Sequence, residues 1–201
     1  MRLPLIRYSR LLTLLPFICL PLKTYGQGWS WDDASQGWGM FVLGLASGYG
    51  THELGHYVVA TSKGDKVSHD GLSIVYPGAQ FTDAERLQVA SAGFQTQWLM
   101  AELALRDRDG KERKPGNFGA GVVCAHLGIT LAYQTVLKNN KQGDVVGMAE
   151  ATKRSNDSIA LALAVPGVLD AWRLFGNQVP EWVPQLSLLS KGLGIAWIWT
   201  Y

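Results

Sequence analysis

Hydrophobic residues gather in five long stretches that are separated by polar segments. The stretches cover residues 37–60, 87–105, 118–137, 158–175 and 186–201. The middle three have about the 17–25 residues that a helix needs to cross a bilayer. All five are rich in Gly, Ala, Ser and Thr, which allow helices to pack closely in a membrane. The pattern predicts an all-α fold, a polytopic membrane helix bundle, with a soluble bundle of deeply buried helices as the alternative.

Two of the polar segments predict smaller elements. Residues 72–81 alternate loosely between apolar and polar positions and break at Pro77–Gly78. This predicts a small β-hairpin after the first core helix. Residues 138–157 include a short amphipathic helix that is expected from Val145 to Lys153.

The N-terminus has the order of a secretory signal peptide. Arg2, Arg7 and Arg10 precede the apolar run LLTLLPFICLPL, and KTYGQG then ends in small residues. We therefore predict a signal peptide or N-terminal anchor over residues 1–26, followed by an integral membrane domain over residues 27–201. Cleavage after Gly26 and retention of the segment as an uncleaved anchor are both open.

Composition agrees with a membrane domain that carries substantial polar loops. Charged residues make up 17 % of the 201 residues, below the roughly 25 % that is usual for soluble domains. A mean hydropathy of +0.04 is low for a chain wholly buried in lipid. The net charge of +2 and the scattered Lys and Arg exclude nucleic acid as a partner. Cys19 and Cys124 have no nearby partner, which excludes a disulfide framework and a cysteine metal site.

The motif that points to chemistry is THELGHYVVA, at the end of the first hydrophobic stretch. His52 and His56 are four residues apart, so a helix places both imidazoles on one face, where they can bind one zinc ion. Glu53 sits one step round the helix and can reach a water molecule held by the metal. This is the H-E-x-x-H arrangement, in which the glutamate is the general base. The alternative is a pair of core or surface histidines beside an incidental acid.

A catalytic zinc site needs a third protein ligand. Asp170 is the first candidate, because an acid inside an apolar helix is costly and this one follows the Pro166–Gly167 break. Asp144 and Asp157 are the rivals. Asp144 stands in a Gly-Asp turn, and Asp157 stands at the head of the fourth stretch, where helix capping is the ordinary role. We predict Zn²⁺ bound by His52, His56 and Asp170, with the two rivals left open.

These motifs resemble those of the site-2-type intramembrane zinc metalloproteases. FVLGLASGYGTHELGHYVVATSKGDKV resembles their first core helix. VPGVLDAWRLF resembles the later core helix, in which a Pro-rich segment precedes Leu-Asp-Gly, although Ala171 replaces the glycine. SAGFQTQ is a faint match to their Gly-Pro-x-x-Asn stretch and gives Gln97 the substrate-binding position. The resemblance covers about residues 37–175.

The resemblance implies a zinc-dependent endopeptidase that cleaves peptide bonds within or near the membrane, with Glu53 as the catalytic residue. The implied partners are a membrane-embedded protein substrate and the lipid bilayer, and the expected location is a bacterial cell membrane. Two alternatives stay open: a non-catalytic zinc-binding membrane protein with a regulatory or scaffold role, and a soluble-style zinc protease on an anchored helical domain. His126 is expected to be a packed helix histidine, and His69 a solvated loop residue.

Overall fold

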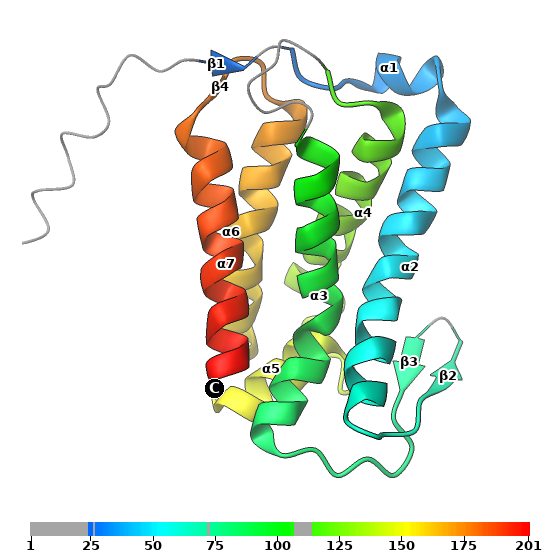
Figure 1. Cartoon of the computed structure of the whole chain (residues 1–201), viewed down its shortest axis with the longest axis vertical. Helices are drawn as coiled ribbons and strands as arrows, with labels where there is room; N and C mark the ends of the chain where they lie inside the picture. Colours follow the sequence, from blue (N-terminus) through cyan, green and yellow to red (C-terminus); the bar gives the residue numbers. More distant parts are fainter. Residues whose placement is uncertain (1–23, 26, 72, 107–113) are drawn as a thin grey trace, which may run out of the picture.

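Five long helices stand side by side and form the body of the protein (Figure 1). The computed structural model describes residues 24–25, 27–71, 73–106 and 114–201. The helices in these ranges are α1 (Trp31–Ser35), α2 (Trp38–Ser62), α3 (Asp83–Leu105), α4 (Asn117–Gln134), α5 (Asp144–Thr152), α6 (Asn156–Phe175) and α7 (Trp182–Thr200). The strands are β1 (Thr24–Tyr25), β2 (Ser68–Asp70), β3 (Ser73–Val75) and β4 (Val179–Pro180). The short helix α5 crosses the lower end of the bundle, beside the hairpin end of α2.

The prediction of a mainly helical fold is confirmed, since each hydrophobic stretch forms one long helix. The helix ends differ by a few residues because polar caps, not apolar residues, set them. Thr82 and Glu85 form a capping box that starts α3 before its apolar run begins. Ser155 caps α6, which leaves Asp157 in the first turn and corrects the capping role expected for it.

The predicted β-hairpin exists, but its turn lies earlier in the chain than expected. β2 and β3 pair antiparallel, with Ser68 opposite Val75. Pro77 and Gly78 form a separate turn, in which the N–H of Ala79 donates to the carbonyl of Tyr76. Gly78 has a φ of +78°, as the third position of a type II turn requires. The Pro-Gly pair therefore leads the chain from the hairpin into α3.

Small residues bring α2 and α4 close together. Gly44 and Gly121 meet at the crossing, where a Cβ on either glycine would lie 2.1 Å from a carbonyl oxygen of the other helix. One turn further along α2, a Cβ on Gly48 would lie 2.6 Å from the Cβ of Ala125. Gly44 and Gly48 start a buried row with a spacing of four residues along α2. The row continues through His52, His56 and Ala60, so close helix packing carries both histidines into the interior.

Most of the expected signal peptide or anchor, residues 1–26, lies outside the described residues. Thr24 and Tyr25 of this segment form β1, which pairs antiparallel with β4. The chain that follows is fixed to the upper end of the bundle by Trp29. Its indole is buried, stacks on Phe41 with ring centroids 5.1 Å apart, and donates its N–H to Asn117.

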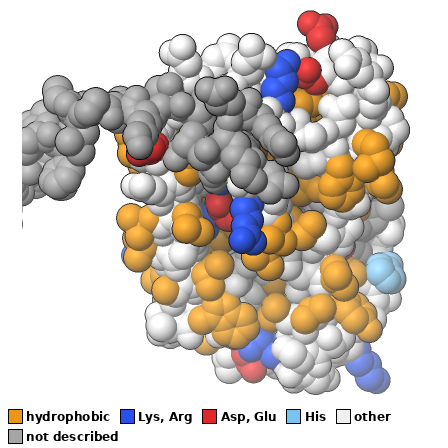
Figure 2. All heavy atoms as spheres, turned by 45° about the horizontal axis from the view of Figure 1, so that its top comes forward, with side chains coloured by type: hydrophobic (Ala, Val, Ile, Leu, Met, Phe, Trp, Pro, Cys, Tyr) orange, Lys and Arg blue, Asp and Glu red, His pale blue; other side chains and the backbone are white. Residues whose placement is uncertain are grey.

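Hydrophobic side chains cover much of the outside of the bundle, and several polar side chains lie among the apolar residues of its core. Figure 2 shows hydrophobic side chains spread across the side of the molecule. The exposed ones include Leu161, Val165 and Val168 of α6. The buried polar ones are His52, His56, Ser91, Gln97, His126, Thr130, Thr152, Asp170, Arg173, Ser187 and Lys191.

Among the described helices, α6 alone is long and apolar enough to cross a membrane. The sequence predicted several membrane-spanning helices, so the structure supports fewer spans than the predicted polytopic bundle. Buried polar residues such as Gln97 in α3 and Lys191 in α7 lower the mean hydropathy of the helices that carry them.

Candidate metal centre

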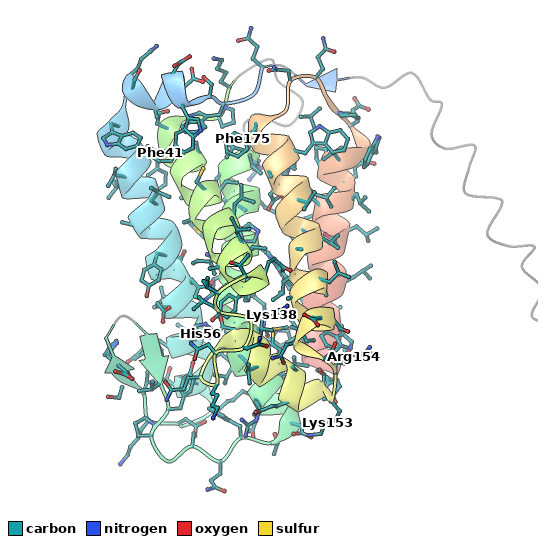
Figure 3. The ribbon with its side chains drawn as sticks, turned by 180° about the vertical axis from the view of Figure 1, so that it is seen from behind. Phe41, His56, Lys138, Lys153, Arg154 and Phe175 are labelled. Carbon is teal, nitrogen blue, oxygen red and sulfur yellow. The ribbon has the colours of Figure 1, made fainter. Side chains whose placement is uncertain are left out.

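His56 lies near the lower end of α2 (Figure 3), and His52 lies one turn before it on the same buried face. Both are buried, and their Nε2 atoms are 3.2 Å apart. Nδ1 of His56 lies 2.8 Å from the carbonyl oxygen of Val89 in α3, so Nδ1 donates there and Nε2 is the atom that would bind a metal in place of a proton. The four-residue spacing puts both imidazoles on one face of α2, and the hydrogen bond to Val89 orients the ring of His56. The two Nε2 atoms therefore face the same point.

The acidic group that joins them is Asp144, the first residue of α5. One carboxylate oxygen of Asp144 lies 3.1 Å from Nε2 of His52, and the other lies 3.3 Å from Nε2 of His56. Ligand atoms of one tetrahedral zinc ion, at about 2.0–2.2 Å from the metal, lie about 3.3–3.6 Å from one another. The three side chains therefore present donor atoms at nearly the separations that zinc requires. Within the described residues, no other group of three such donors comes together.

Asp144 is held in place and kept charged by its neighbours. Its backbone N–H donates to the hydroxyl oxygen of Tyr133, at 3.2 Å. Burial raises the pKa of Asp144, but the charge of His56 and hydrogen bonds from both histidines outweigh burial and hold the pKa well below its usual value. The carboxylate is therefore ready to bind a cation at neutral pH.

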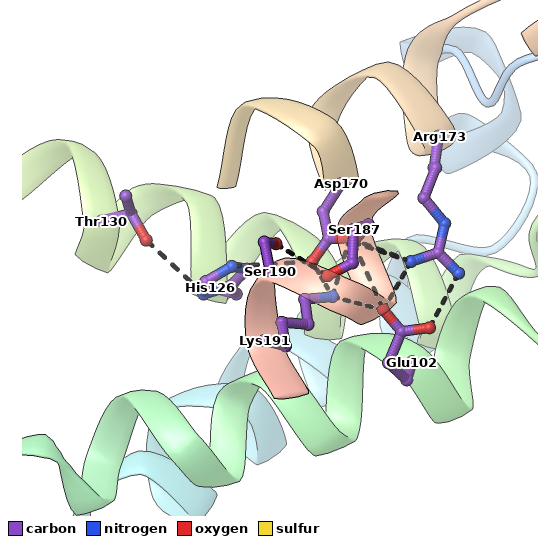
Figure 4. Close-up of polar contacts among 8 residues, drawn as sticks. All are labelled: Glu102, His126, Thr130, Asp170, Arg173, Ser187, Ser190 and Lys191. Atoms are coloured by element: carbon purple, nitrogen blue, oxygen red, sulfur yellow. Dashed lines mark hydrogen bonds and ion pairs between the residues drawn. The ribbon is translucent and has the colours of Figure 1, made fainter. Parts of the chain in front are cut away.

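Asp170 does not belong to this donor group, so the prediction that it is the third ligand beside the histidines is corrected. Its carboxylate accepts hydrogen bonds from Ser187 (2.7 Å) and Lys191 (2.8 Å), and from Arg173 at 3.1 Å. Figure 4 shows this cluster between α3, α6 and α7, with Glu102 on its other side. Two bases thus neutralise two acids inside the bundle, and Asp170 needs no metal to be stable there.

Asp157, the other rival, is exposed and pairs with Lys138. It does not join the histidines.

The cluster around Asp170 predicts a large effect on stability. Nζ of Lys191, which is 2 % exposed, lies 2.5 Å from Glu102 and 2.6 Å from Asp170. Lys191→Met would leave buried negative charge with only Arg173, which costs about 3–5 kcal/mol. We expect the apparent Tm in detergent to fall by about 10 °C, because 1 kcal/mol corresponds to roughly 2–4 °C in a domain of this size.

The matched control is Lys153→Met, which breaks an exposed pair with Asp83. It should cost about 1 kcal/mol or less. Equal melting curves for the two variants would contradict a stabilising role for the cluster. Zinc binding should be the same in both.

Glu53 lies beside the three donors and faces a cavity of about 540 Å³. Its carboxylate accepts the backbone N–H of Ile74 in β3, at 3.2 Å, which ties the hairpin to α2. His52, His56 and Asp144 line the same cavity. The volume is within the roughly 300–1,000 Å³ typical of ligand pockets. A substrate in the cavity would therefore meet the acid and the donor group together.

Tyr76 was not singled out in the sequence, yet it also lines the cavity. Burial, and after it the charges of Asp144 and Glu53, raise the pKa of Tyr76 far above its usual value. The phenol stays protonated and can donate a hydrogen bond into the cavity. A lone tyrosine after a short strand carries no sequence signal for this position.

The remaining predicted residues lie away from the cavity. Gln97 is buried inside the bundle and does not line the cavity, so its position does not support the predicted contact with substrate. His126 is buried with Nε2 3.7 Å from Asp170, as expected for a packed helix histidine. His69 is exposed in β2.

Gly93 of α3 lies directly against the ring of His52. A Cβ added to Gly93 would come within 2.4 Å of the imidazole, which is closer than real contacts allow. Gly93→Ala should therefore displace the ring and weaken zinc binding by about 10- to 100-fold, the usual cost of losing support for a ligand. Competition with a chromogenic chelator measures the affinity.

The control for this variant is Gly50→Ala on α2, where an added Cβ meets no atom within 4 Å. The control should bind zinc as the wild type does. If Gly93→Ala also bound zinc with unchanged affinity, His52 would not be a ligand in the orientation that the structure gives it.

Comparison with known proteins adds no relative. No family model, curated protein or solved structure matches the chain. His52, His56 and Asp144 form a group that could hold a metal ion.

Proposed function

We propose that the protein is a zinc-dependent endopeptidase that cleaves peptide bonds within or near a membrane. The observation that carries the proposal is the group of His52, His56 and Asp144 with Glu53 beside it on one cavity. Two imidazoles and one carboxylate are a donor set that catalytic zinc sites use, with one position left for water or substrate.

The donor set fits zinc better than it fits the harder cations. Mg²⁺ and Ca²⁺ prefer oxygen ligands, and here two of the three donors are nitrogen atoms. A zinc ion held here would supply Lewis acidity, which polarises a peptide carbonyl and acidifies a water molecule.

Glu53 has the position and the freedom of a general base. It is half-buried at the cavity, where its carboxylate accepts the N–H of Ile74 and interacts with the hydroxyl of Tyr49. A carboxylate has about four lone pairs, so others can accept a proton from water. Its role in the proposed reaction is to take a proton from the attacking water and pass it to the amine of the leaving peptide. Tyr76 would stay neutral beside it and donate a hydrogen bond.

The membrane part of the proposal rests on the distribution of side chains. An apolar exterior around a core that also holds buried charged and polar groups suits a protein with lipid around it, and large exposed apolar surfaces are rare on soluble monomers. The apolar helix α6 is the strongest single candidate for a span. Tryptophans occur near both ends of the bundle, with Trp31 and Trp38 at one end and Trp197 and Trp199 at the other.

The likeness to site-2-type proteases is part of this proposal, with one departure. The HELGH block supplies two of the donors, as the resemblance implies. The segment with Asp170 does not supply the third, since Asp144 of α5 stands beside the histidines. Relationship to that family is therefore proposed on the first block alone.

A non-catalytic zinc-binding membrane protein is the second candidate, because the same three donors would hold a structural ion. The experiment that separates the two is co-expression with a library of tagged single-span membrane proteins. Fragments are compared between cells with the wild-type chain and cells with a Glu53 variant. Fragments that depend on Glu53 support the endopeptidase, and their absence supports the second candidate.

A further inference from the structure

A second cavity, of about 420 Å³, lies between α3, α6 and α7. It shares no residue with the cavity at the metal centre. Its walls are largely apolar and include Trp98, Leu163, Pro166, Gly194, Trp197 and Ile198. We call it the α6–α7 groove. A helix is about 10 Å wide, so this volume would accept about one turn of helix. The groove is therefore too small for a partner helix and suits a thin apolar chain.

One charged residue, Arg154, stands at the edge of the groove. It is exposed and lies at the same end of the bundle as Lys138 and Lys153 (Figure 3). Three acids of this end have other partners: Asp157 pairs with Lys138, Asp83 with Lys153, and Glu150 with Arg86. No ion pair of Arg154 occurs within the described residues, so its guanidinium can bind an external anion.

Trp98 adds a large aromatic surface to the apolar wall. The far edge of its ring lies against Gly194, which also lines the groove. The groove thus combines an apolar wall with an unpaired cation at one end.

We propose that the α6–α7 groove binds one acyl chain of an anionic glycerophospholipid, with the phosphate at Arg154. Arg154 and Pro166 both line the cavity. Arg154 lies two residues before α6 begins, and Pro166 lies about 15 Å along α6 from its first residue, Asn156. An extended acyl chain covers that distance. The site rests on the proposed membrane location, but it does not depend on zinc or on proteolysis.

The test uses the full-length chain in neutral detergent and native mass spectrometry. Dioleoyl phosphatidylglycerol and dioleoyl phosphatidylcholine are titrated separately, and the bound lipid is counted for each. Wild-type protein should retain one phosphatidylglycerol more tightly than phosphatidylcholine. Arg154→Gln should weaken phosphatidylglycerol about fivefold, the equivalent of about 1 kcal/mol for one basic residue, and remove the preference.

A second variant tests the apolar wall. Ala162 is exposed at the groove, so Ala162→Phe should fill the groove without disturbing the core and should weaken both lipids at least tenfold. The matched controls are Lys153→Gln, beside Arg154, and Leu161→Phe, whose side chain lies outside the groove. Both controls should bind lipid as the wild type does.

Three results would overturn the proposal: equal affinity of the wild type for the two lipids, unchanged binding by Ala162→Phe, or a protein dimer that Ala162→Phe dissociates. The last would show that a second copy of the chain fills the groove. Zinc content and fragment production, measured on the same variants, should not change. A wild-type protein that bound no zinc, or that produced no fragments, would count against the metalloprotease proposal and leave the lipid result standing.

Discussion

Asp144→Asn is expected to weaken zinc binding by more than about 100-fold, while the chain still folds. The carboxylate places one oxygen near each histidine, and an amide replaces one of those oxygens with an NH₂ group that cannot bind a cation. Loss of an outer-shell partner costs up to about 100-fold, so loss of a ligand should cost more. Metal content after dialysis, together with chelator competition, measures the effect.

Two asparagine variants serve as controls for this result. Asp157→Asn changes an exposed acid that pairs with Lys138, and it should leave both zinc affinity and stability nearly unchanged. Asp170→Asn should keep zinc but melt earlier, because Asp170 belongs to the buried cluster with Lys191 and Arg173. His56→Ala should match Asp144→Asn. If Asp170→Asn lost zinc and Asp144→Asn kept it, the metal would lie at Asp170 instead.

Glu53→Gln is expected to lower the rate of peptide cleavage by about 10²- to 10⁴-fold, the usual cost of removing a general base. The substitution is well matched to this site. The glutamine oxygen can still accept the N–H of Ile74, so the hairpin should stay attached to α2. Zinc content should not change, since Glu53 is not among the three donors. Quantitative blotting of tagged fragments, normalised to the amount of enzyme in the membrane, gives the rate.

Glu150→Gln is the control, because Glu150 lines the same cavity and pairs with Arg86 at an exposed position. It should cleave at close to the wild-type rate. Equal fragment yields from wild type and Glu53→Gln, with zinc fully bound in both, would identify a zinc-binding protein that does not cut peptides. His52, His56 and Asp144 would then bind zinc without taking part in catalysis.

Local patterns in the sequence determined the helices and two of the three donors of the metal centre. Each long helix follows from a hydrophobic stretch, because the length of an apolar run is a property of neighbouring residues. The spacing of His52 and His56 put both side chains on one face, and Glu53 followed from the same helix period. The β-hairpin was predicted too, but its turn was misplaced, since Pro77–Gly78 turns the chain towards α3 instead.

Only the tertiary structure decided which acid stands beside the histidines. Asp144 is 92 residues from His52, and it reaches the site because α5 crosses the end of the bundle. The cost of an acid in an apolar helix made Asp170 the leading candidate. That cost is real, but Lys191 of α7 and Arg173 compensate for it. A sequence pattern shows that a buried charge needs a partner, whereas the partner itself depends on how distant helices pack.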